Sequence, residues 1–316
     1  MAFALMMAVA VACLLLFLVS LLLSSRRNHK HKLPPGPANL PFIGNLHRFG
    51  ELPHRSLHKL SQTHGPLMFL KLGTVPAVIA SSANTAKEFL KTYDLQCCSR
   101  PPLTSLGKLS YGFRDIAFAP YGEQWRELRK LCMVELFSSK KVASFRSIRE
   151  EEVQRMIDSV SNSSQNHSEI NLRKELLSLA NNITCRTALG KRYYGEGCNN
   201  DGGSRLHKIL TETQALFTGF FFADYFPVLG WLDAFTGMKA RLEKNFREQD
   251  EFYQQVIDEH LNPTMRADQD DMNGDAIDAL LDMRKKATHL TFDHIKGVLM
   301  VNLFILLQIQ IFFSHY

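Results

Sequence analysis

Trp125 and Arg129 form the pair whose residue types and spacing point most directly to binding chemistry. They lie four residues apart in Pro120-Tyr121-Gly122-Glu123-Gln124-Trp125-Arg126-Glu127-Leu128-Arg129-Lys130. The Pro-Tyr-Gly triplet predicts a helix start, and residues four apart share a helical face. An indole N–H and a guanidinium are both donors, so the pair could bind a carboxylate on a molecule with an apolar body. The alternative, more frequent on composition alone, is a buried tryptophan beside a surface arginine.

Other motifs that would carry chemistry are incomplete. The acidic run at residues 268–275 has Gln269 and Leu280 where a calcium loop needs Asp and Glu. Gly195-x-Gly197 follows no predicted strand and lacks the third glycine of a dinucleotide loop. The sequence contains no H-E-x-x-H, G-x-S-x-G or phosphate-binding loop. We therefore predict no metal site and no catalytic residue.

The six cysteines show no C-x-x-C spacing, which argues against a zinc site or a disulfide framework. Cys132 shares a helical face with Trp125 and Arg129, and we interpret it as a buried structural cysteine. The six are Cys13, Cys97, Cys98, Cys132, Cys185 and Cys198.

The N-terminal segment must position the rest of the chain. Met1 to Leu23 is apolar apart from Ser20, and as a helix it would span about 35 Å, enough to cross a bilayer. No charge precedes this run, which disfavours the alternative of a cleaved signal peptide. We expect residues 1–25 to be a single transmembrane anchor. The basic residues Arg26, Arg27, Lys30 and Lys32 then leave the bulk of the chain in the cytosol.

The composition and charge of the chain exclude several classes of protein. Of 316 residues, 45% are hydrophobic and 22% charged, which excludes a disordered chain. The formal charge is +6, but outside residues 1–32 there are 33 basic and 31 acidic side chains. A nucleic-acid binder shows a basic face on its folded domain, so we expect no nucleic-acid partner.

The elements predicted after the anchor are a proline-rich hinge, a small sheet and many helices. Residues 26–52 include Leu33-Pro34-Pro35-Gly36-Pro37, which favours stiff, extended backbone. Runs at Leu67–Leu72 and Ala77–Ala80 predict a β-hairpin turning at residues 73–76. From Ser82 onward, apolar residues recur at helical spacing and predict buried helix faces. The fold class is predominantly α with a small N-terminal β-sheet. One apolar stripe comprises Phe145, Ile148, Val153, Met156, Ile157 and Val160.

Together these motifs resemble the cytochrome P-450 superfamily, in its plant microsomal form. They occur in order as L-P-P-G-P from Leu33, P-x-I-G-N-L-H from Pro41, Ser99-Arg100-Pro101, F-A-P-Y-G-x-x-W-R-x-x-R-K from Phe118, Ala223-Asp224-Tyr225-Phe226-Pro227, and Leu290-Thr291 followed by Ile295-Lys296-Gly297-Val298-Leu299-Met300.

The resemblance implies a haem-thiolate monooxygenase that inserts oxygen into a small lipophilic substrate. Trp125 and Arg129 match the helix pair that holds the haem propionates. The loop from Arg100 to Phe118 matches the first substrate-recognition segment, so Phe113, Ile116 and Phe118 are expected to line a pocket. Electrons would come from an NADPH-dependent flavoprotein reductase, and the location would be the endoplasmic reticulum membrane.

The resemblance runs from residue 1 to about Met300, and residues 53–300 would be the N-terminal part of the monooxygenase domain. The apolar residues 301–316 are expected to be a non-family tail. The family's A-G-x-[DE]-T helix, E-x-x-R helix and F-x-x-G-x-R-x-C-x-G loop do not occur in the sequence. We therefore expect an incomplete haem-thiolate monooxygenase fold without the axial cysteine, inactive as written. The alternative is a non-catalytic, membrane-anchored remnant or interaction fragment.

Overall fold

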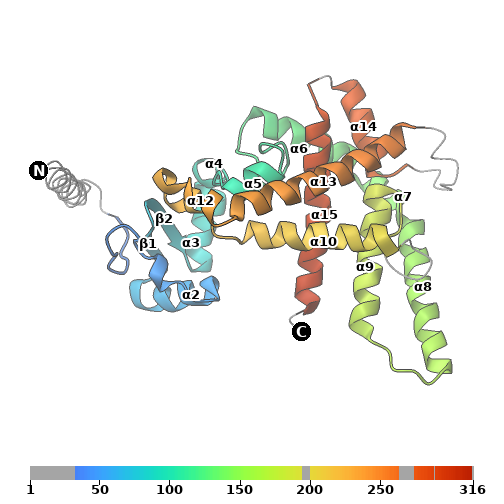
Figure 1. The fold of residues 1–316 in the computed structure, drawn as a ribbon, viewed down its shortest axis with the longest axis horizontal. Coiled ribbons are helices and arrows are strands. Elements are labelled where there is room, and N and C mark those ends of the chain that lie inside the picture. Colours follow the sequence, from blue (N-terminus) through green and yellow to red (C-terminus); the bar gives the residue numbers. More distant parts are fainter. Residues whose placement is uncertain (1–32, 194–199, 263–273, 288, 315–316) are drawn as a thin grey trace, which may run out of the picture. The chain divides into compact units, whose positions relative to one another are not determined.

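The structure is a computed structural model that describes residues 33–193, 200–262, 274–287 and 289–314. The chain divides into two compact units, residues 1–92 and 93–316, which are treated separately below (Figure 1). The predicted anchor, residues 1–25, lies outside the described residues. Within the described ranges, no helix is both long enough and apolar enough to cross a bilayer.

The first unit contains the predicted β-hairpin. Strands β1 (Leu67–Leu72) and β2 (Val75–Ala80) pair antiparallel, with Leu67 opposite Ala80 and Leu72 opposite Val75. The turn needs only Gly73 and Thr74 because Gly73 adopts a left-handed φ of 63°, so β2 begins two residues earlier than predicted. The other elements of this unit are the 3-10 helix Leu46–Arg48, α2 (Pro53–His64), α3 (Ala83–Lys87) and a π-helical turn at Glu88–Thr92.

The described part of the predicted hinge is hydrogen-bonded to β1. The carbonyl of Pro35 accepts the Phe69 N–H at 2.9 Å. The side chain of Asn45 accepts the Lys71 N–H at 2.8 Å and donates to the Ala38 carbonyl at 3.2 Å. The proline-rich segment is therefore part of this unit and not a free linker.

In the described residues of the second unit, all the regular secondary structure is helical. Its longer helices are α6, α8, α9, α10, α13, α14 and α15, and short helices fill the connections. In chain order they are α4 (Asp94–Cys97), α5 (Thr104–Leu109), α6 (Glu123–Glu135), α7 (Ser139–Ser144), α8 (Arg146–Gln165), α9 (Leu172–Leu189), α10 (Asn200–Phe217), α11 (Phe222–Tyr225), a 3-10 turn (Pro227–Leu229), α12 (Leu232–Phe235), α13 (Met238–Leu261), α14 (Ala276–Lys286) and α15 (Phe292–Ser314).

Local signals fix several helix ends. The side chain of Asn171 caps α9 by accepting the Lys174 N–H, and Gly190 ends this helix in the left-handed conformation. Asp275 and Asp278 form a capping box at the start of α14. These caps satisfy backbone groups that would otherwise lack partners at the helix ends.

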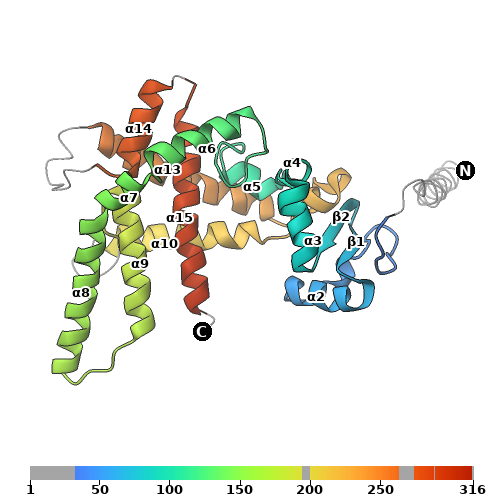
Figure 2. The same ribbon diagram turned by 180° about the vertical axis from the view of Figure 1, so that it is seen from behind.

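Helix α15 supplies much of the core of the second unit. It packs against α9, α10, α13 and α14, and its side chains Val298, Leu299 and Leu303 are fully buried (Figures 1 and 2). The helix continues through Met300 to Ser314 without interruption. The sequence boundary expected near Met300 therefore does not coincide with a helix end.

Helices α8 and α9 lie side by side, and the buried face of α8 differs from the predicted one (Figures 1 and 2). Ile148 and Glu152 are buried, whereas Val153 and Ile157 are exposed. Glu152 is buried because it accepts hydrogen bonds from Arg186 at 2.8 Å and from Arg192.

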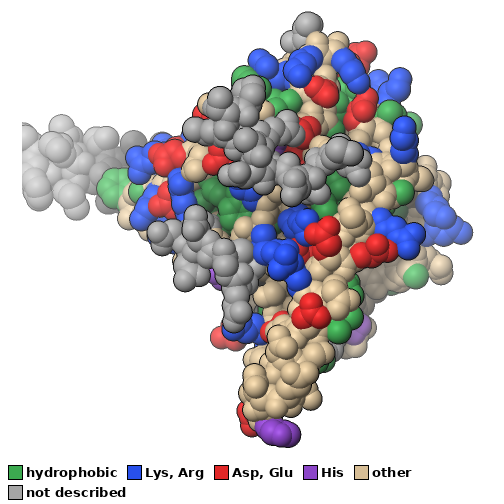
Figure 3. Space-filling view, turned by 90° about the vertical axis from the view of Figure 1, so that its right-hand side faces the viewer, with side chains coloured by type: hydrophobic (Ala, Val, Ile, Leu, Met, Phe, Trp, Pro, Cys, Tyr) green, Lys and Arg blue, Asp and Glu red, His purple; other side chains and the backbone are tan. Residues whose placement is uncertain are grey.

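On the face in Figure 3, basic and acidic side chains are interspersed.

Candidate cofactor and substrate site

Helix α6 holds Trp125 and Arg129 on one face, as their spacing predicted. The Trp125 side chain is half-buried, and its Nε1–H donates to the Ile116 carbonyl at 3.0 Å. Arg129 is exposed, and its guanidinium carbon lies 5.2 Å from the centre of the Trp125 ring. The indole therefore connects α6 to the preceding loop and also carries the guanidinium on its face.

The buried carboxylate of Asp115 holds that loop by hydrogen bonds to its backbone. Asp115 is fully buried, and its Oδ1 accepts the N–H groups of Ala117 and Phe118, each at 2.6 Å. Burial raises the pKa of Asp115 above its ordinary value of 3.8, although the two backbone hydrogen bonds oppose this shift. Among the described residues, its Oδ2 has no hydrogen-bond partner. Arg100 also holds the loop, because its side chain donates a hydrogen bond to the Ala117 carbonyl at 3.2 Å.

The first turns of α15 press against the same loop. A Cβ added to Gly297 would lie 2.5 Å from the carbonyl oxygen of Arg114 and 3.4 Å from Cβ of Asp115. Only glycine permits so close an approach without displacing the loop backbone. The Arg114 guanidinium also forms an ion pair with Asp293 on α15. The loop is thus held from α6 and from α15.

The three predicted substrate residues do not all pack together. Ile116 and Phe118 pack against the main core, and the Phe118 ring lies 5.2 Å from Phe217 and 6.3 Å from Phe304 in edge contacts. Phe113 adopts a left-handed φ of 62°, and its ring covers Gly107 of α5 instead. Their role in lining a substrate pocket stays a prediction.

The residues present fit one part of a haem group. Within the described ranges, no carboxylate forms an ion pair with Arg129, so its charge can receive a propionate. The Trp125 N–H is already donated to the Ile116 carbonyl. The indole can therefore offer a haem group its ring surface but not a hydrogen bond. Burial raises the pKa of the Cys132 and Cys185 thiols to about 12, so both are protonated at neutral pH. Neither cysteine has the thiolate character of an iron ligand.

One cluster has residue types that can bind metals, namely His260, Asp275 and Asp278. Nδ1 of His260 faces the Val256 carbonyl at 2.7 Å, and Nε2 faces Asp275 at 2.6 Å. A carbonyl only accepts, so Nδ1 carries a hydrogen, and Nε2 donates to the carboxylate. Burial lowers the pKa of His260, but the Asp275 contact outweighs it and raises the pKa above 6.5. Both ring nitrogens of His260 are thus engaged by protein groups, and the histidine holds Asp275, the N-cap of α14, in place.

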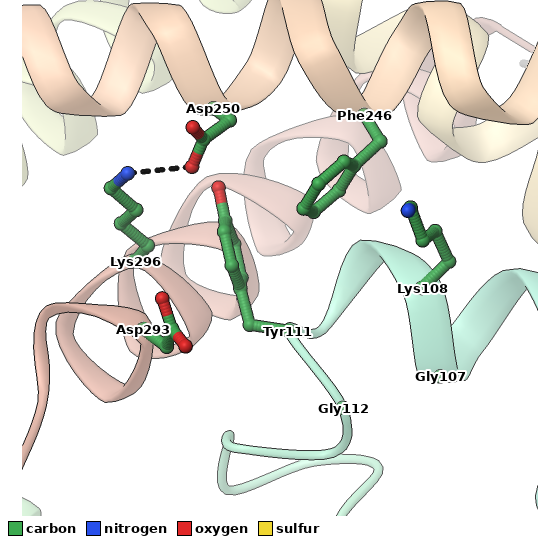
Figure 4. Close-up of a pocket in the computed structure, with 8 residues that line it drawn as sticks. All are labelled: Gly107, Lys108, Tyr111, Gly112, Phe246, Asp250, Asp293 and Lys296. Carbon is green, nitrogen blue, oxygen red and sulfur yellow. Dashed lines mark hydrogen bonds and ion pairs between the residues drawn. The ribbon is translucent and has the colours of Figure 1, made fainter.

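Sequence reasoning missed a cavity of about 480 Å³ (Figure 4). Lys296 had appeared only within a family motif, and its neighbours across the cavity come from distant segments. No local pattern joins these residues, so only the folded chain shows them together. The lining residues are Gly107, Lys108, Tyr111, Gly112, Phe246, Asp250, Asp293 and Lys296.

Comparison with known proteins identifies the class to which this fold and helix motif belong. A family model described as Cytochrome P450 matches residues 34–304. A solved structure titled "Zebra fish cytochrome P450 another structure with Progesterone" aligns with a TM-score of 0.60 at 19% identity, over 79% of this chain and 55% of that one. This likeness supports the fold. The chain belongs to the cytochrome P450 family, as its motifs predicted.

Among its relatives are plant members of this family. It is 46% identical over 297 residues to Cytochrome P450 71A9 of Glycine max, across 92% of this chain and 58% of that protein. It is 43% identical over 295 residues to Cytochrome P450 71B10 of Arabidopsis thaliana, across 90% of this chain and 57% of that protein. The chain thus spans less than two thirds of the length of these curated relatives.

Proposed function

We propose that this chain carries the propionate-binding helix and the first substrate loop of a membrane-bound, haem-dependent monooxygenase acting on small lipophilic molecules. The observation that carries the proposal is Arg129, an exposed guanidinium stacked on Trp125 in the family's helix motif. A cation without a carboxylate partner in the described ranges suits an anionic group on a cofactor.

Each element of the site has a distinct task in this proposal. Bound haem with a thiolate ligand supplies the oxygen-activating chemistry. Arg129 would bind a propionate by charge-assisted hydrogen bonds, and Trp125 would keep the guanidinium in place. Ile116 and Phe118 would present apolar surface to a lipophilic substrate and exclude water. Electron supply is assigned to an NADPH-dependent flavoprotein reductase on the basis of the family alone.

An exposed apolar segment supports the membrane part of the proposal. Val228 is 88% exposed, Trp231 60% and Phe235 81%, and all three lie between α11 and α13. Large apolar side chains gathered on a surface mark contact sites, and tryptophan favours the membrane interface. We propose that this segment touches the endoplasmic reticulum membrane to which residues 1–25 would anchor the chain.

The proposal is tested with a haem-loading experiment. Residues 1–300 of this chain are joined to the part of the Glycine max relative that follows the position aligned with Met300. The reduced carbon monoxide spectrum of the joined protein is then recorded. The joined protein should show a thiolate-type Soret band. Arg129→Ala should then weaken haem retention about 10- to 100-fold, because a hydrogen bond to a charged group contributes about 1.5–3 kcal/mol. Residues 1–316 alone should give no such band.

Arg126→Ala is the matched control, because Arg126 lies on the same helix and is also exposed. It should leave haem retention unchanged. Equal losses in the two variants, or no band from the joined protein, would contradict the proposal and favour a non-catalytic role. A thiolate-type band from residues 1–316 alone would also contradict it, and Cys132→Ser would then identify the ligand.

A further inference from the structure

A buried pair of titratable side chains joins the end of α13 to the start of α14 (Figure 1). His260 lies in the last turn of α13, and Asp275 is the N-cap of α14. The two residues are only 8% and 7% exposed. Neither lies on α6 or lines the cavity of Figure 4. The role of this pair is therefore independent of haem and of the proposed function.

The geometry of the pair requires a bound proton. Nδ1 of His260 lies 2.7 Å from the Val256 carbonyl oxygen, which only accepts, so Nδ1 must carry a hydrogen. Nε2 lies 2.6 Å from Oδ2 of Asp275, and a second hydrogen must lie between these two atoms. Without it, a nitrogen lone pair would face a buried carboxylate at hydrogen-bond distance, and the contact would become unfavourable.

Charged groups on α7, α13 and α14 lie around the pair. Asp278 accepts the backbone N–H of the N-cap residue at 3.2 Å, and Lys141 of α7 donates to the Gly274 carbonyl at 2.8 Å. Glu259, next in the chain to the histidine, is paired with Lys191 at 2.7 Å. Burial lowers the pKa of the histidine, but the N-cap carboxylate and the charge of Asp278 outweigh it and hold the pKa above 6.5.

The pair fixes the start of a helix that belongs to the core. Helix α14 packs against α6, α9 and α15, and Ile277 and Leu280 in its first turns are buried. The Asp275 side chain accepts the Asp278 N–H at 3.0 Å and so caps this helix. A carboxylate repelled by an unprotonated ring nitrogen would leave this position, and the first turn of α14 would lose its cap.

We propose that the proton shared by His260 and Asp275 is a pH-sensitive switch, which holds the first turn of α14 on α13 while it is bound and releases this turn when alkaline pH removes it. The contribution of the histidine to stability is full below pH 6.5, its ordinary pKa. This contribution is lost as pH rises through the higher pKa of the folded state. Because one proton is involved, the unfolding equilibrium constant increases at most about tenfold per pH unit over that interval.

The first test is urea unfolding of the 316-residue chain from about pH 6 to about pH 9. His260→Gln keeps a donor for Asp275 but cannot titrate, so its stability profile should lack the alkaline loss of the native chain. Asp275→Asn still caps the helix, and its amide can donate to an unprotonated Nε2, so the alkaline loss should disappear there too. The matched control is His207→Gln, because His207 is exposed on α10, and its profile should follow the native one.

Hydrogen exchange followed by mass spectrometry locates the release. Comparison of the native chain with His260→Gln at each pH cancels the intrinsic effect of pH on exchange. As pH rises, native amides at the start of α14 should lose protection relative to the variant, and those of α10 should not.

Three results would each overturn the proposal. They are parallel unfolding profiles for the native chain and His260→Gln, an alkaline loss that persists in Asp275→Asn, and equal changes of exchange in α10 and α14. If His260→Gln does not fold, the native chain is compared with Asp275→Asn in both measurements, and the same outcomes decide.

Discussion

Replacing Asp115 with alanine should loosen the loop that joins α6 to the predicted substrate residues. The substitution removes the acceptor of two N–H groups, those of Ala117 and Phe118. An unsatisfied buried donor costs about 1–3 kcal/mol, and both residues here are half-buried. Taking the lower half of that range, about 1–2 kcal/mol, for each of the two donors, we expect the free energy of unfolding to fall by about 2–4 kcal/mol.

Asp115→Asn is the control that separates hydrogen bonding from charge. Its amide oxygen can still accept both N–H groups, so its unfolding free energy should stay within about 1 kcal/mol of native. The raised pKa of Asp115 means that the native state binds more protons than the unfolded state above pH 3.8. Stability from this group therefore falls as pH rises through that interval. The asparagine variant should gain on the native protein as pH rises from about 4 toward neutrality.

Urea unfolding followed by tryptophan fluorescence measures both effects. A Trp231→Phe background leaves Trp125 as the sole tryptophan, and its N–H is donated to Ile116 in the loop. Loosening the loop should expose the indole and move its emission to longer wavelength. The reasoning is refuted if Asp115→Ala unfolds within about 0.5 kcal/mol of native and leaves Trp125 emission unchanged.

Three further predictions concern other parts of the chain. Glu152→Ala should lower the unfolding free energy by about 1.5–3 kcal/mol in urea titrations, since it removes the buried carboxylate that Arg192 and Arg186 share, and Arg186 keeps only the more exposed Glu151. Burial favours a higher pKa for Glu152, but the arginines hold it below 4.5, so its contribution should be full above pH 4.5 and disappear on further acidification. Gly297→Ala should cost about 1–3 kcal/mol in the same assay, because its Cβ would meet the Arg114 carbonyl. Asn162 and Asn166 are exposed and should stay unglycosylated in sealed microsomes if residues after the anchor face the cytosol.

Each of these predictions has an outcome that contradicts it. Glu151→Ala removes a half-exposed partner of the same arginine and should cost less than about 1 kcal/mol, so an equal loss would deny that burial matters. A Gly297→Ala variant as stable as native would mean that α15 can shift away from the loop. Glycan on Asn162 or Asn166 would reverse the predicted topology.

Local chemistry explains which parts of the fold could be predicted. The hairpin was predictable because β-rich runs flank a glycine that can adopt positive φ, and its strands pair as expected. Trp125 and Arg129 share a face because helix geometry alone decides it. In α13, apolar residues at helical spacing, among them Leu242, Tyr253 and Val256, are buried, as the general helical periodicity after Ser82 predicts.

Long-range contacts account for what the sequence did not predict. Glu152 lies on the buried face of α8 because Arg186 and Arg192 pair with its carboxylate there. These partners are 34 and 40 residues further along the chain, so no local pattern predicts the burial. Lys296 is buried because Asp250, 46 residues earlier, accepts its hydrogen bond. A pattern that assigns charged residues to the surface places both wrongly, because burial of a charge depends on a partner from another element.

The contacts around α6 separate two roles that the sequence motif combines. The Trp125 N–H is donated to the Ile116 carbonyl, so the indole joins the helix to the loop. Arg129, stacked on the same ring, is left to meet an anion. The binding of an anion at Arg129 and the positions of the Ile116 and Phe118 side chains would then both depend on the Trp125 indole. Loss of Asp115, which does not touch Arg129, should therefore weaken anion binding there by releasing the loop that orders the indole.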